Sequence, residues 1–267
     1  MRVLITGVAG FAGSGLTKRL LAKGYRVTGL DIVAPLQSEY LWDIKDNSNF
    51  THVWKALQDI NVTDIIGHDI IIHLAAQADV PMGFSSPKWT IEQNVMGTVS
   101  LLEACRGVSL SKFIIAGSGN EFGRPIYLPI DELHPLTPHN PYAFSKAAEE
   151  MAGKAYNLCY GIPMTIMSNG ACLGPQMRKE IFVFKWLYNI ERGLPVVLEG
   201  GNQTRDLTYV SDILDAWELV IEAPPALING EKFQVSYGEE HTVEEILEWC
   251  FDICGKRVPV VRNPHRP

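Results

Sequence analysis

The stretch TGVAGFAG, residues 6–13, decides the predicted fold. It follows a short apolar run and opens a stretch of helical periodicity at 11–24. Its glycines Gly7, Gly10 and Gly13 are spaced three apart. Small residues at such a strand-to-helix turn let backbone amides approach a diphosphate at the helix N-terminus. Tight turns also use glycine for structural reasons alone, so the loop by itself leaves both interpretations open.

An acidic residue at the end of the next apolar run favours a nucleotide site. This run, YRVTGLDI (25–32), places Asp31 at the end of the second expected strand. A carboxylate there can bind both ribose hydroxyls of a dinucleotide, and it would repel the 2′-phosphate of NADP. We therefore expect NAD as the cofactor, with a turn or capping residue as the alternative interpretation of Asp31.

Short apolar runs alternate with helical patterns along the first part of the chain. This alternation predicts an α/β fold, a Rossmann-like doubly wound parallel sheet covered by helices on both faces. The expected strands are 2–6, 25–32, 52–59, 68–76, 112–118 and 163–168, and the expected helices are 11–24, 91–107 and 141–161.

The pattern becomes irregular after residue 168, where prolines and paired glycines interrupt it. Two further helices are expected, from about Ser211 to Glu222 and from Val243 to Cys254. We expect an NAD-binding Rossmann domain at 1–168, to which 206–236 returns. A smaller C-terminal substrate-binding domain is expected to comprise 169–205 and 237–267.

Charge and composition exclude several classes of function. The chain has 267 residues and a net charge of −7, and it contains no Lys/Arg cluster, which argues against nucleic-acid binding. Five cysteines without a CxxC pattern argue against a disulfide framework or a metal site. No apolar run approaches the ~20 residues of a membrane span, and no signal-peptide pattern is present. We expect a cytoplasmic protein without membrane contact.

The segment NPYAFSKAAEE (140–150) combines a helix start with a phenol and an ammonium group. Asn140 is a good N-cap and Pro141 a good first helical residue, which puts Tyr142 in the first turn. The helix dipole and Lys146, four residues further on, would both lower the pKa of the phenol. A tyrosine tuned in this way can act as an acid or base at neutral pH.

A surface interpretation of the same segment stays open at this point. Lys146 could pair outward with Glu149 or Glu150 while Tyr142 packs. The neighbouring segment GSGNEFG (117–123) bears on the choice, because it closes the fifth expected strand. Carboxyl ends of parallel strands face the ligand crevice, so Ser118 is expected beside the substrate or, alternatively, as a capping serine.

Together these segments resemble the extended short-chain dehydrogenase/reductase superfamily, and within it the nucleotide-sugar epimerase/dehydratase family. The resemblance covers almost the whole chain, with its motifs in the expected order. It rests on TGVAGFAG (6–13), HLAAQADV (73–80), Ser118 and YAFSK (142–146), with NVMGT (94–98) and QTRDLTYVSD (203–212) as further landmarks.

The resemblance implies a role for each matched position. Tyr142 would be the catalytic acid/base, Lys146 would bind the nicotinamide ribose and tune Tyr142, and Ser118 would assist proton transfer at the sugar O4. Asn169, Arg205 and Arg266 would contact the substrate, a nucleotide-diphosphate sugar. Besides Tyr142 and Lys146, the implied NAD-binding residues are Gly7, Gly10, Phe11 and Ala12 at the pyrophosphate, Asp31 at the adenosine ribose, Asp59 and Ile60 at the adenine, and Leu74, Ala75, Ala76 and Asn94 along the cofactor path.

Three departures from the family pattern bear on the activity. Dehydratases carry Asp-Glu directly after the catalytic hydroxyl residue, whereas this chain has Gly119 and Asn120 there. Ser168 and Ala171 occupy slots where relatives have Arg and Asn, so Asn169 substitutes only in part. The chain ends in HRP, at the position of an RPG motif in relatives, so the usual C-terminal tail is expected to be lacking.

The favoured activity is that of an NAD-dependent nucleotide-sugar 4-epimerase, which oxidises the sugar transiently at C4 and returns the hydride. The alternative is a nucleotide-4-keto-6-deoxy-sugar reductase, because GSGNEFG (117–123) resembles the corresponding segment of such reductases. A decarboxylase, a dehydratase and a non-catalytic NAD-binding protein rank lower. Helices 91–107 and 141–161 are expected to form a homodimer, although Leu101, Leu102, Met151 and Ala155 could equally face the sheet.

Overall fold

The computed structural model describes residues 1–35 and 37–264, and it divides the chain into two compact units. The larger unit comprises Met1–Asn169 and Ser211–Val235, and the smaller unit comprises Gly170–Val210 and the chain from Ser236 onward. The return to the larger unit thus begins at Ser211, five residues later than expected. Cofactor binding by the one unit and substrate binding by the other stay predictions.

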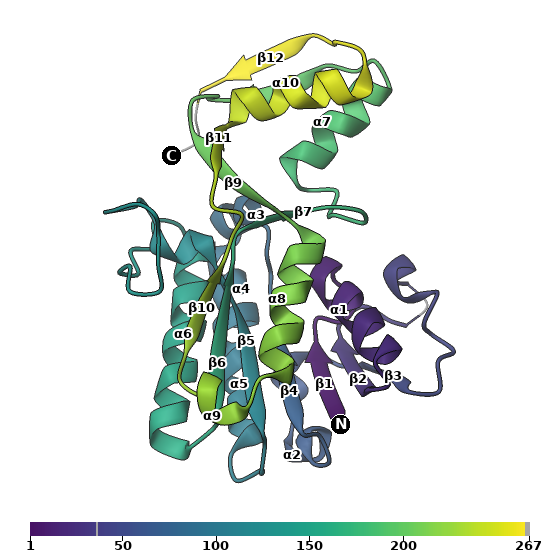
Figure 1. The fold of residues 1–267 in the computed structure, drawn as a ribbon, viewed down its shortest axis with the longest axis vertical. Coiled ribbons are helices and arrows are strands. Elements are labelled where there is room, and N and C mark those ends of the chain that lie inside the picture. The colour runs from purple at the N-terminus through teal and green to yellow at the C-terminus, as the bar shows by residue number, and fades with distance from the viewer. Residues whose placement is uncertain (36, 265–267) are drawn as a thin grey trace. The chain divides into compact units, whose positions relative to one another are not determined.

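A seven-stranded parallel sheet forms the centre of the larger unit (Figure 1). Its strand order is β10-β6-β5-β4-β1-β2-β3, and every neighbouring pair is parallel. This order confirms the predicted Rossmann-like doubly wound fold. The strands are β1 (Arg2–Thr6), β2 (Arg26–Asp31), β3 (Phe50–Trp54), β4 (Ile70–His73), β5 (Lys112–Ser118), β6 (Met164–Asn169) and β10 (Lys232–Val235).

Helices cover both faces of this sheet (Figure 1). On one face α1 and α8 lie side by side, and Arg19 of α1 pairs with Glu218 of α8 at 2.9 Å. On the other face α5 and α6 pack over the strands. The helices of the larger unit are α1 (Phe11–Ala22), α2 (Val62–Ile65), α3 (Val80–Ser85), α4 (Pro87–Ile91), α5 (Gly97–Cys105), α6 (Pro141–Tyr160), α8 (Val210–Glu222) and α9 (Pro225–Ile228), with a π-helical turn η3 (Glu92–Met96) before α5 and 3₁₀ turns η1 (Glu39–Leu41), η2 (Leu57–Asp59) and η4 (Gly119–Phe122).

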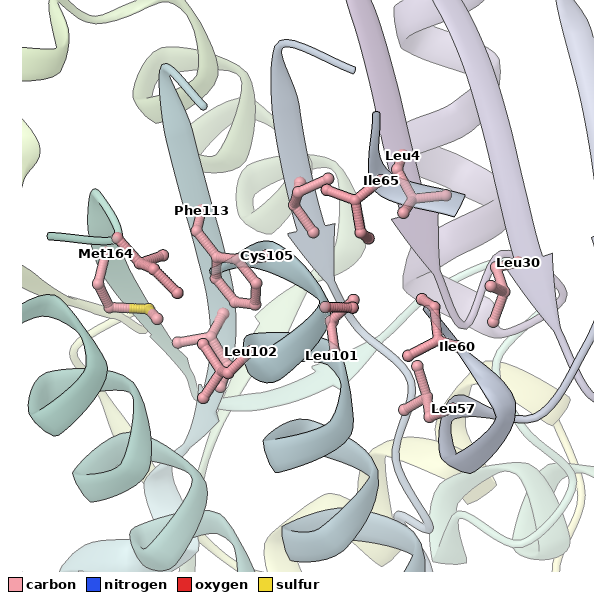
Figure 2. Packing of buried hydrophobic residues seen from close by; sticks show 14 of the residues in the cluster. Leu4, Leu30, Leu57, Ile60, Ile65, Leu101, Leu102, Cys105, Phe113 and Met164 are labelled. Atoms are coloured by element: carbon pink, nitrogen blue, oxygen red, sulfur yellow. The ribbon is translucent and has the colours of Figure 1, made fainter. Parts of the chain in front are cut away.

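One hydrophobic core lies between the sheet and α5 (Figure 2). Phe113 of β5 and Leu4 of β1 contribute from the strands, and α5 contributes Leu101 and Leu102, which are fully buried. These two leucines therefore face the sheet of their own chain, which is the alternative stated for them from the sequence. Alternation along the strands puts Val3 and Ile5 on the opposite face.

The third strand differs from its prediction. It lies at Phe50–Trp54 rather than at 52–59, because its neighbour β2 ends where Asp31 pairs with Trp54. Beyond this point the chain turns into η2 (Leu57–Asp59), and Leu57 enters the core. An apolar run alone does not show where its neighbouring strand stops.

The smaller unit contains two helices and two small sheets. The helix α10 (Val243–Cys254) matches its prediction and starts at a capping box between Thr242 and Glu245. The helix α7 was not predicted, although Val183, Trp186 and Ile190 follow a helical period and pack against α10. Its elements are α7 (Phe182–Glu191), α10, the sheet β11-β9-β7 (Glu240–Thr242, Thr204–Tyr209, Ala171–Leu173) and the pair β12-β8 (Val260–Asn263, Val196–Glu199).

Within the described ranges 1–35 and 37–264, no helix has the length and apolar character needed to cross a membrane. The same residues contain no group of three or more His, Cys, Asp or Glu side chains that could hold a metal ion.

The strand order reverses between β1 and β4, and a ligand crevice is expected at such a switch point. Gly7 follows β1 with φ +73°, a left-handed conformation. A Cβ on Gly7 would lie 2.6 Å from the Ala75 amide nitrogen and 2.8 Å from the Leu74 carbonyl carbon. Only glycine therefore lets the loop after β1 touch the chain after β4.

Replacing Gly7 with alanine is expected to destabilise the protein through both strain and collision. Gly24 is a matched control, because it has φ +80° but a Cβ there would meet no described atom within 4 Å. We expect Gly24→Ala to cost about 1 kcal/mol of unfolding free energy and Gly7→Ala about 3 kcal/mol or more. Urea unfolding measures both, and equal losses would contradict a tight approach at Gly7.

Candidate active site

The loop after β1 leads into α1 without a capping side chain. Gly10 is the N-cap, and among the described residues no side chain hydrogen-bonds to the amides of the first turn. Gly10 N–H donates to the Gly7 carbonyl at 3.0 Å, which closes the turn. The amides of Phe11 and Ala12 stand at the positive end of the helix dipole. This arrangement fits a diphosphate, as the sequence predicts for these residues.

Asp31 lies next to this loop at the end of β2. Its two carboxylate oxygens accept hydrogen bonds from the backbone N–H groups of Ala9, at 2.9 Å, and Val33, at 3.0 Å. The carboxylate is thereby fixed beside the glycine loop. Each oxygen keeps a further lone pair, so the group can accept hydrogen bonds from a ribose diol.

The chain after β4 is held in place by Asn94 of η3. The Asn94 side chain accepts from the Gln77 N–H at 2.6 Å and donates to the Gln77 carbonyl at 3.0 Å and to Ser145 Oγ at 2.8 Å. Asn94 thus joins the segment that carries Leu74, Ala75 and Ala76 to α6. These bonds shape the segment, and the place of Asn94 along the cofactor path stays a prediction.

Of the two residues expected at the adenine, Ile60 packs its side chain into the core beside Leu57. Its backbone is therefore the part available to a ligand. Asp59 ends η2 and is exposed. Both residues follow the carboxyl end of β3, and Asp31 lies at the carboxyl end of the parallel neighbour β2.

Tyr142 stands in the first turn of α6, as predicted. Asn140 is the N-cap, with Oδ1 accepting from the Ala143 N–H at 2.8 Å, and Pro141 is the first helical residue. Gly83 of α3 packs against Tyr142, since a Cβ on Gly83 would lie 3.3 Å from the Tyr142 Cβ. The phenol ring is mostly buried by these contacts.

Lys146 is paired with Glu149, but the pair points inward. Lys146 Nζ donates to Glu149 Oε2 at 2.6 Å, and the side chains of Lys146 and Glu149 are 4% and 1% exposed. Lys146 does pair with Glu149, but the pair lies inside the protein and not at the surface, so the surface interpretation of the segment is wrong. A buried ion pair of this kind, one turn from Tyr142, places a second titratable group near the phenol.

Burial and neighbouring charges compete at this pair. Burial acts to lower the pKa of Lys146, but Glu149 and then Tyr142 raise it by more, so it lies above its ordinary value. Burial raises the pKa of Glu149 to about 7, against the opposing effect of Lys146. Burial, with a contribution from Lys146, lowers the pKa of His73 to about 3. Lys146 therefore stays charged, and His73 is neutral.

Ser118 is the last residue of β5 and the N-cap of η4. Its Oγ accepts from the backbone N–H and from the side-chain amide of Asn120, both at 3.3 Å, and its own N–H donates to Glu121 Oε2 at 3.2 Å. The helix α6 packs against β5 and η4. The turn that holds Ser118 and the helix that holds Tyr142 and Lys146 are therefore in contact.

The three further residues expected to contact the substrate lie in different parts of the chain. Asn169 ends β6 in the larger unit, and its Oδ1 accepts from Trp217 Nε1 at 3.2 Å. Arg205 belongs to the smaller unit, on β9, where Nη1 donates to the Thr204 carbonyl at 2.7 Å. In the described part of the chain, Arg205 has no acidic partner. Arg266 lies outside the described residues.

Comparisons with known proteins agree on one family. The sequence model described as GDP-mannose 4,6 dehydratase matches residues 4–264. A UDP-glucose 4-epimerase of Mycolicibacterium smegmatis is 31% identical over an alignment of 255 residues that covers 92% of this chain and 80% of that relative.

Two solved structures are similar over the whole chain. A UDP-glucuronic acid 4-epimerase from Bacillus cereus, in complex with UDP-glucuronic acid and NAD, has a TM-score of 0.93 at 26% identity and is covered over 87% of its length. A dTDP-glucose 4,6-dehydratase from Streptomyces venezuelae, with NAD bound, has a TM-score of 0.91 at 26% identity and is covered over 85%.

The strand order, the glycine loop and the Tyr-x-x-x-Lys helix define an extended short-chain dehydrogenase/reductase. Within this superfamily, the chain belongs to the family of NAD-dependent nucleotide-sugar epimerases and dehydratases. The resemblance stated from the sequence is thereby confirmed, and the protein is an enzyme of this family.

Substituting glutamine for Glu149 is expected to change how stability depends on pH. The folded state holds the proton of Glu149 up to about pH 7, whereas the carboxyl of an unfolded chain titrates near 4.5. The stability that comes from this difference is present below pH 4.5 and is lost as the pH rises to 7. Glu149→Gln removes this loss, so its melting temperature relative to wild type should rise between pH 5 and 7.5.

Calorimetric melting of both proteins across this range is the measurement. Glu150→Gln serves as the control on the same helix. Burial acts to raise the pKa of Glu150, but Lys154 and Lys232 lower it by more, so Glu150 stays charged across this range. The difference in melting temperature between Glu150→Gln and wild type should therefore not change with pH. If the difference in melting temperature between Glu149→Gln and wild type does not change with pH either, Glu149 is charged over the whole range from pH 5 to 7.5.

Proposed function

We propose that this protein is an NAD-dependent nucleotide-sugar 4-epimerase. The observation that carries the proposal is the composition of the site around Ser118. Among the described residues, Tyr142 is the acid/base candidate there, with Ser118 assisting it, and the slot after Ser118 contains Gly119 and Asn120 instead of two carboxylic acids. A reaction that only removes and returns one hydride and one proton at C4 needs no more than this.

The cofactor proposal is supported by the fit of the glycine loop and Asp31. The uncapped start of α1 suits a diphosphate, and Gly7 leaves no room for a side chain where the loop touches Ala75. Asp31, fixed by two backbone amides, suits the two free hydroxyls of the adenosine ribose in NAD. Its negative charge disfavours the 2′-phosphate of NADP.

When bound, NAD supplies the acceptor and donor of the hydride at sugar C4. Tyr142 takes the proton of the C4 hydroxyl as the carbonyl forms, and returns it when the hydride is restored to the opposite face. The charged Lys146, one helical turn from Tyr142, interacts electrostatically with this side chain. The Ser118 hydroxyl, whose Oγ accepts from Asn120, is free to donate its own proton toward O4.

The surroundings of Glu121 argue against dehydration, although dehydratases are among the similar proteins. Glu121 is the only carboxylic acid in the turn after Ser118, and it is fully buried. Its oxygens accept from the Ser118 N–H, from Ser168 and from Lys232. A carboxyl engaged in this way is not available as the second acid/base that water loss requires.

The second candidate function is reduction of a nucleotide-4-keto-6-deoxy-sugar. Glu121, two residues before Gly123, favours it, because GSGNEFG resembles the corresponding segment of such reductases. A reductase consumes its cofactor and often uses NADPH, which Asp31 disfavours. Decarboxylation ranks lower, since Asn120 holds the slot where a glutamate is expected.

An exposed apolar stripe on α6 supports the proposal of a homodimer. Met151 is 64% and Leu158 85% exposed, and with Phe144 they recur every seven residues along one side of the helix. Ala155 is exposed on the same side. A second copy of α6 would cover these side chains. The cytoplasmic location stays a prediction.

Turnover without added cofactor tests the proposed activity. The purified protein is expected to carry NAD and to interconvert UDP-glucose and UDP-galactose, or their uronic or N-acetyl analogues. Tyr142→Phe should lower kcat about a thousandfold, the scale of a lost acid/base group. Tyr156→Phe, on the same helix but bonded to Glu103 at the surface, is the control and should retain activity. Turnover only of a 4-keto sugar with added NAD(P)H would support the reductase instead.

Neutralising Asp31 tests the cofactor proposal. Asp31→Asn keeps the size of the side chain and removes its charge, so the preference for NAD over NADP should shrink by about tenfold. Asp46→Asn, at an exposed position, is the charge-matched control. Binding of both cofactors is measured by titration calorimetry on protein freed of NAD. An unchanged preference would remove Asp31 from the cofactor site.

A further inference from the structure

Glu121 is buried beneath Ser118, and its carboxylate joins three strands of the sheet. Oε2 accepts from the Ser118 N–H at 3.2 Å, at the end of β5. Oε1 accepts from Ser168 Oγ on β6 and from Lys232 Nζ on β10, the latter at 2.8 Å. Glu121 and Ser168 are both 0% exposed. Isolated buried carboxylates are costly, so this one depends on its partners.

Lys232 continues the network to α6. Its ammonium group also donates to Glu150 Oε2 at 2.7 Å, and it lies 4.3 Å from the centre of the Phe122 ring. Glu150 in turn accepts from Lys154, which is half exposed, at 2.6 Å. One buried lysine therefore bonds both to the turn that carries Ser118 and to the helix that carries Tyr142.

The backbone leaves room for this network only because residue 117 is glycine. A Cβ on Gly117 would lie 2.8 Å from Ser168 Oγ and 3.2 Å from Glu121 Oε1. The two side chains thus fill the space that any other residue at 117 would occupy. Ser168 contributes a small buried hydroxyl that donates to the carboxylate next to it.

We propose that Glu121 and Lys232 are positioning residues for catalysis: Glu121 fixes the backbone of Ser118, and Lys232 holds Glu121 and Glu150 together, which sets the turn after β5 against α6. This proposal rests on the proposed function of Ser118 and Tyr142. A charged carboxylate is a stronger acceptor for the Ser118 N–H than a neutral carboxyl. Burial acts to raise the pKa of Glu121 and Lys232 opposes this, so loss of Lys232 favours the weaker, protonated acceptor.

The test compares Lys232→Met with Lys154→Met. Both variants remove one ammonium group from the same network, but Lys154 contacts only its outer carboxylate. In Lys232→Met, amide hydrogen exchange over 118–123 should become about tenfold faster, and exchange in β1 and β4 should stay as in wild type. The kcat should fall about tenfold with KM nearly unchanged, and the NAD content should be retained. Lys154→Met should match wild type in every measurement.

Three outcomes would overturn the proposal: unchanged exchange over 118–123, exchange that rises equally in β1 and β4, or an unchanged kcat. If Lys232→Met does not fold, the Glu121→Gln/Lys232→Met double variant removes both charges together and is measured in its place. Ser118→Ala separates this proposal from the proposed function. Full activity of Ser118→Ala would refute the role of Ser118, while the exchange measurement would still decide whether Glu121 and Lys232 fix this turn.

Discussion

The approach of the Gly7 backbone to Leu74 and Ala75 is the constraint on which the candidate site depends. Backbone atoms alone bring the loop after β1 against the chain after β4, at the point where the strand order reverses. Because no side chain fills this place, the uncapped start of α1 and the Asp31 carboxylate stand together at the carboxyl edge of the sheet. The ends of β5 and β6 lie along the same edge. Cofactor chemistry and proton transfer can therefore meet there without any large deviation from regular secondary structure.

Buried charge is the second determinant of this site. The helix α6 carries Lys146, Glu149 and Glu150 on its inner side, where a run of charged residues would ordinarily face water. Each charge has a partner of opposite sign within hydrogen-bonding distance. Lys146 therefore stays charged beside Tyr142, and Lys232 ties the same helix to the turn that holds Ser118. In this protein, burial and pairing together decide which groups near Tyr142 and Ser118 carry charge.

Local signals in the sequence were sufficient for the parts of the fold that local physics determines. Asn140 and Pro141 predicted the start of α6 to the residue, and the alternation of apolar runs with helical patterns predicted the doubly wound sheet. The end of β3 was misplaced because it depends on where its partner β2 stops.

Lys232 was not predicted, since 111 residues separate it from Glu121 along the chain. Its contact exists only once β10 joins the sheet, and no local pattern marks it. The inward direction of the Lys146–Glu149 pair was missed for the same reason, because the helical period does not show which side of α6 the sheet covers.

In the proposed reaction, one hydride leaves sugar C4 and returns to the same carbon within a single site. Incubating the enzyme with a UDP-hexose that carries deuterium at C4, without added cofactor, tests it most directly. We predict a C4-epimerised product that retains the deuterium at C4 and gains no carbon-bound hydrogen from water. Loss of the label to solvent, or conversion that stops unless a reduced cofactor is supplied, would contradict it.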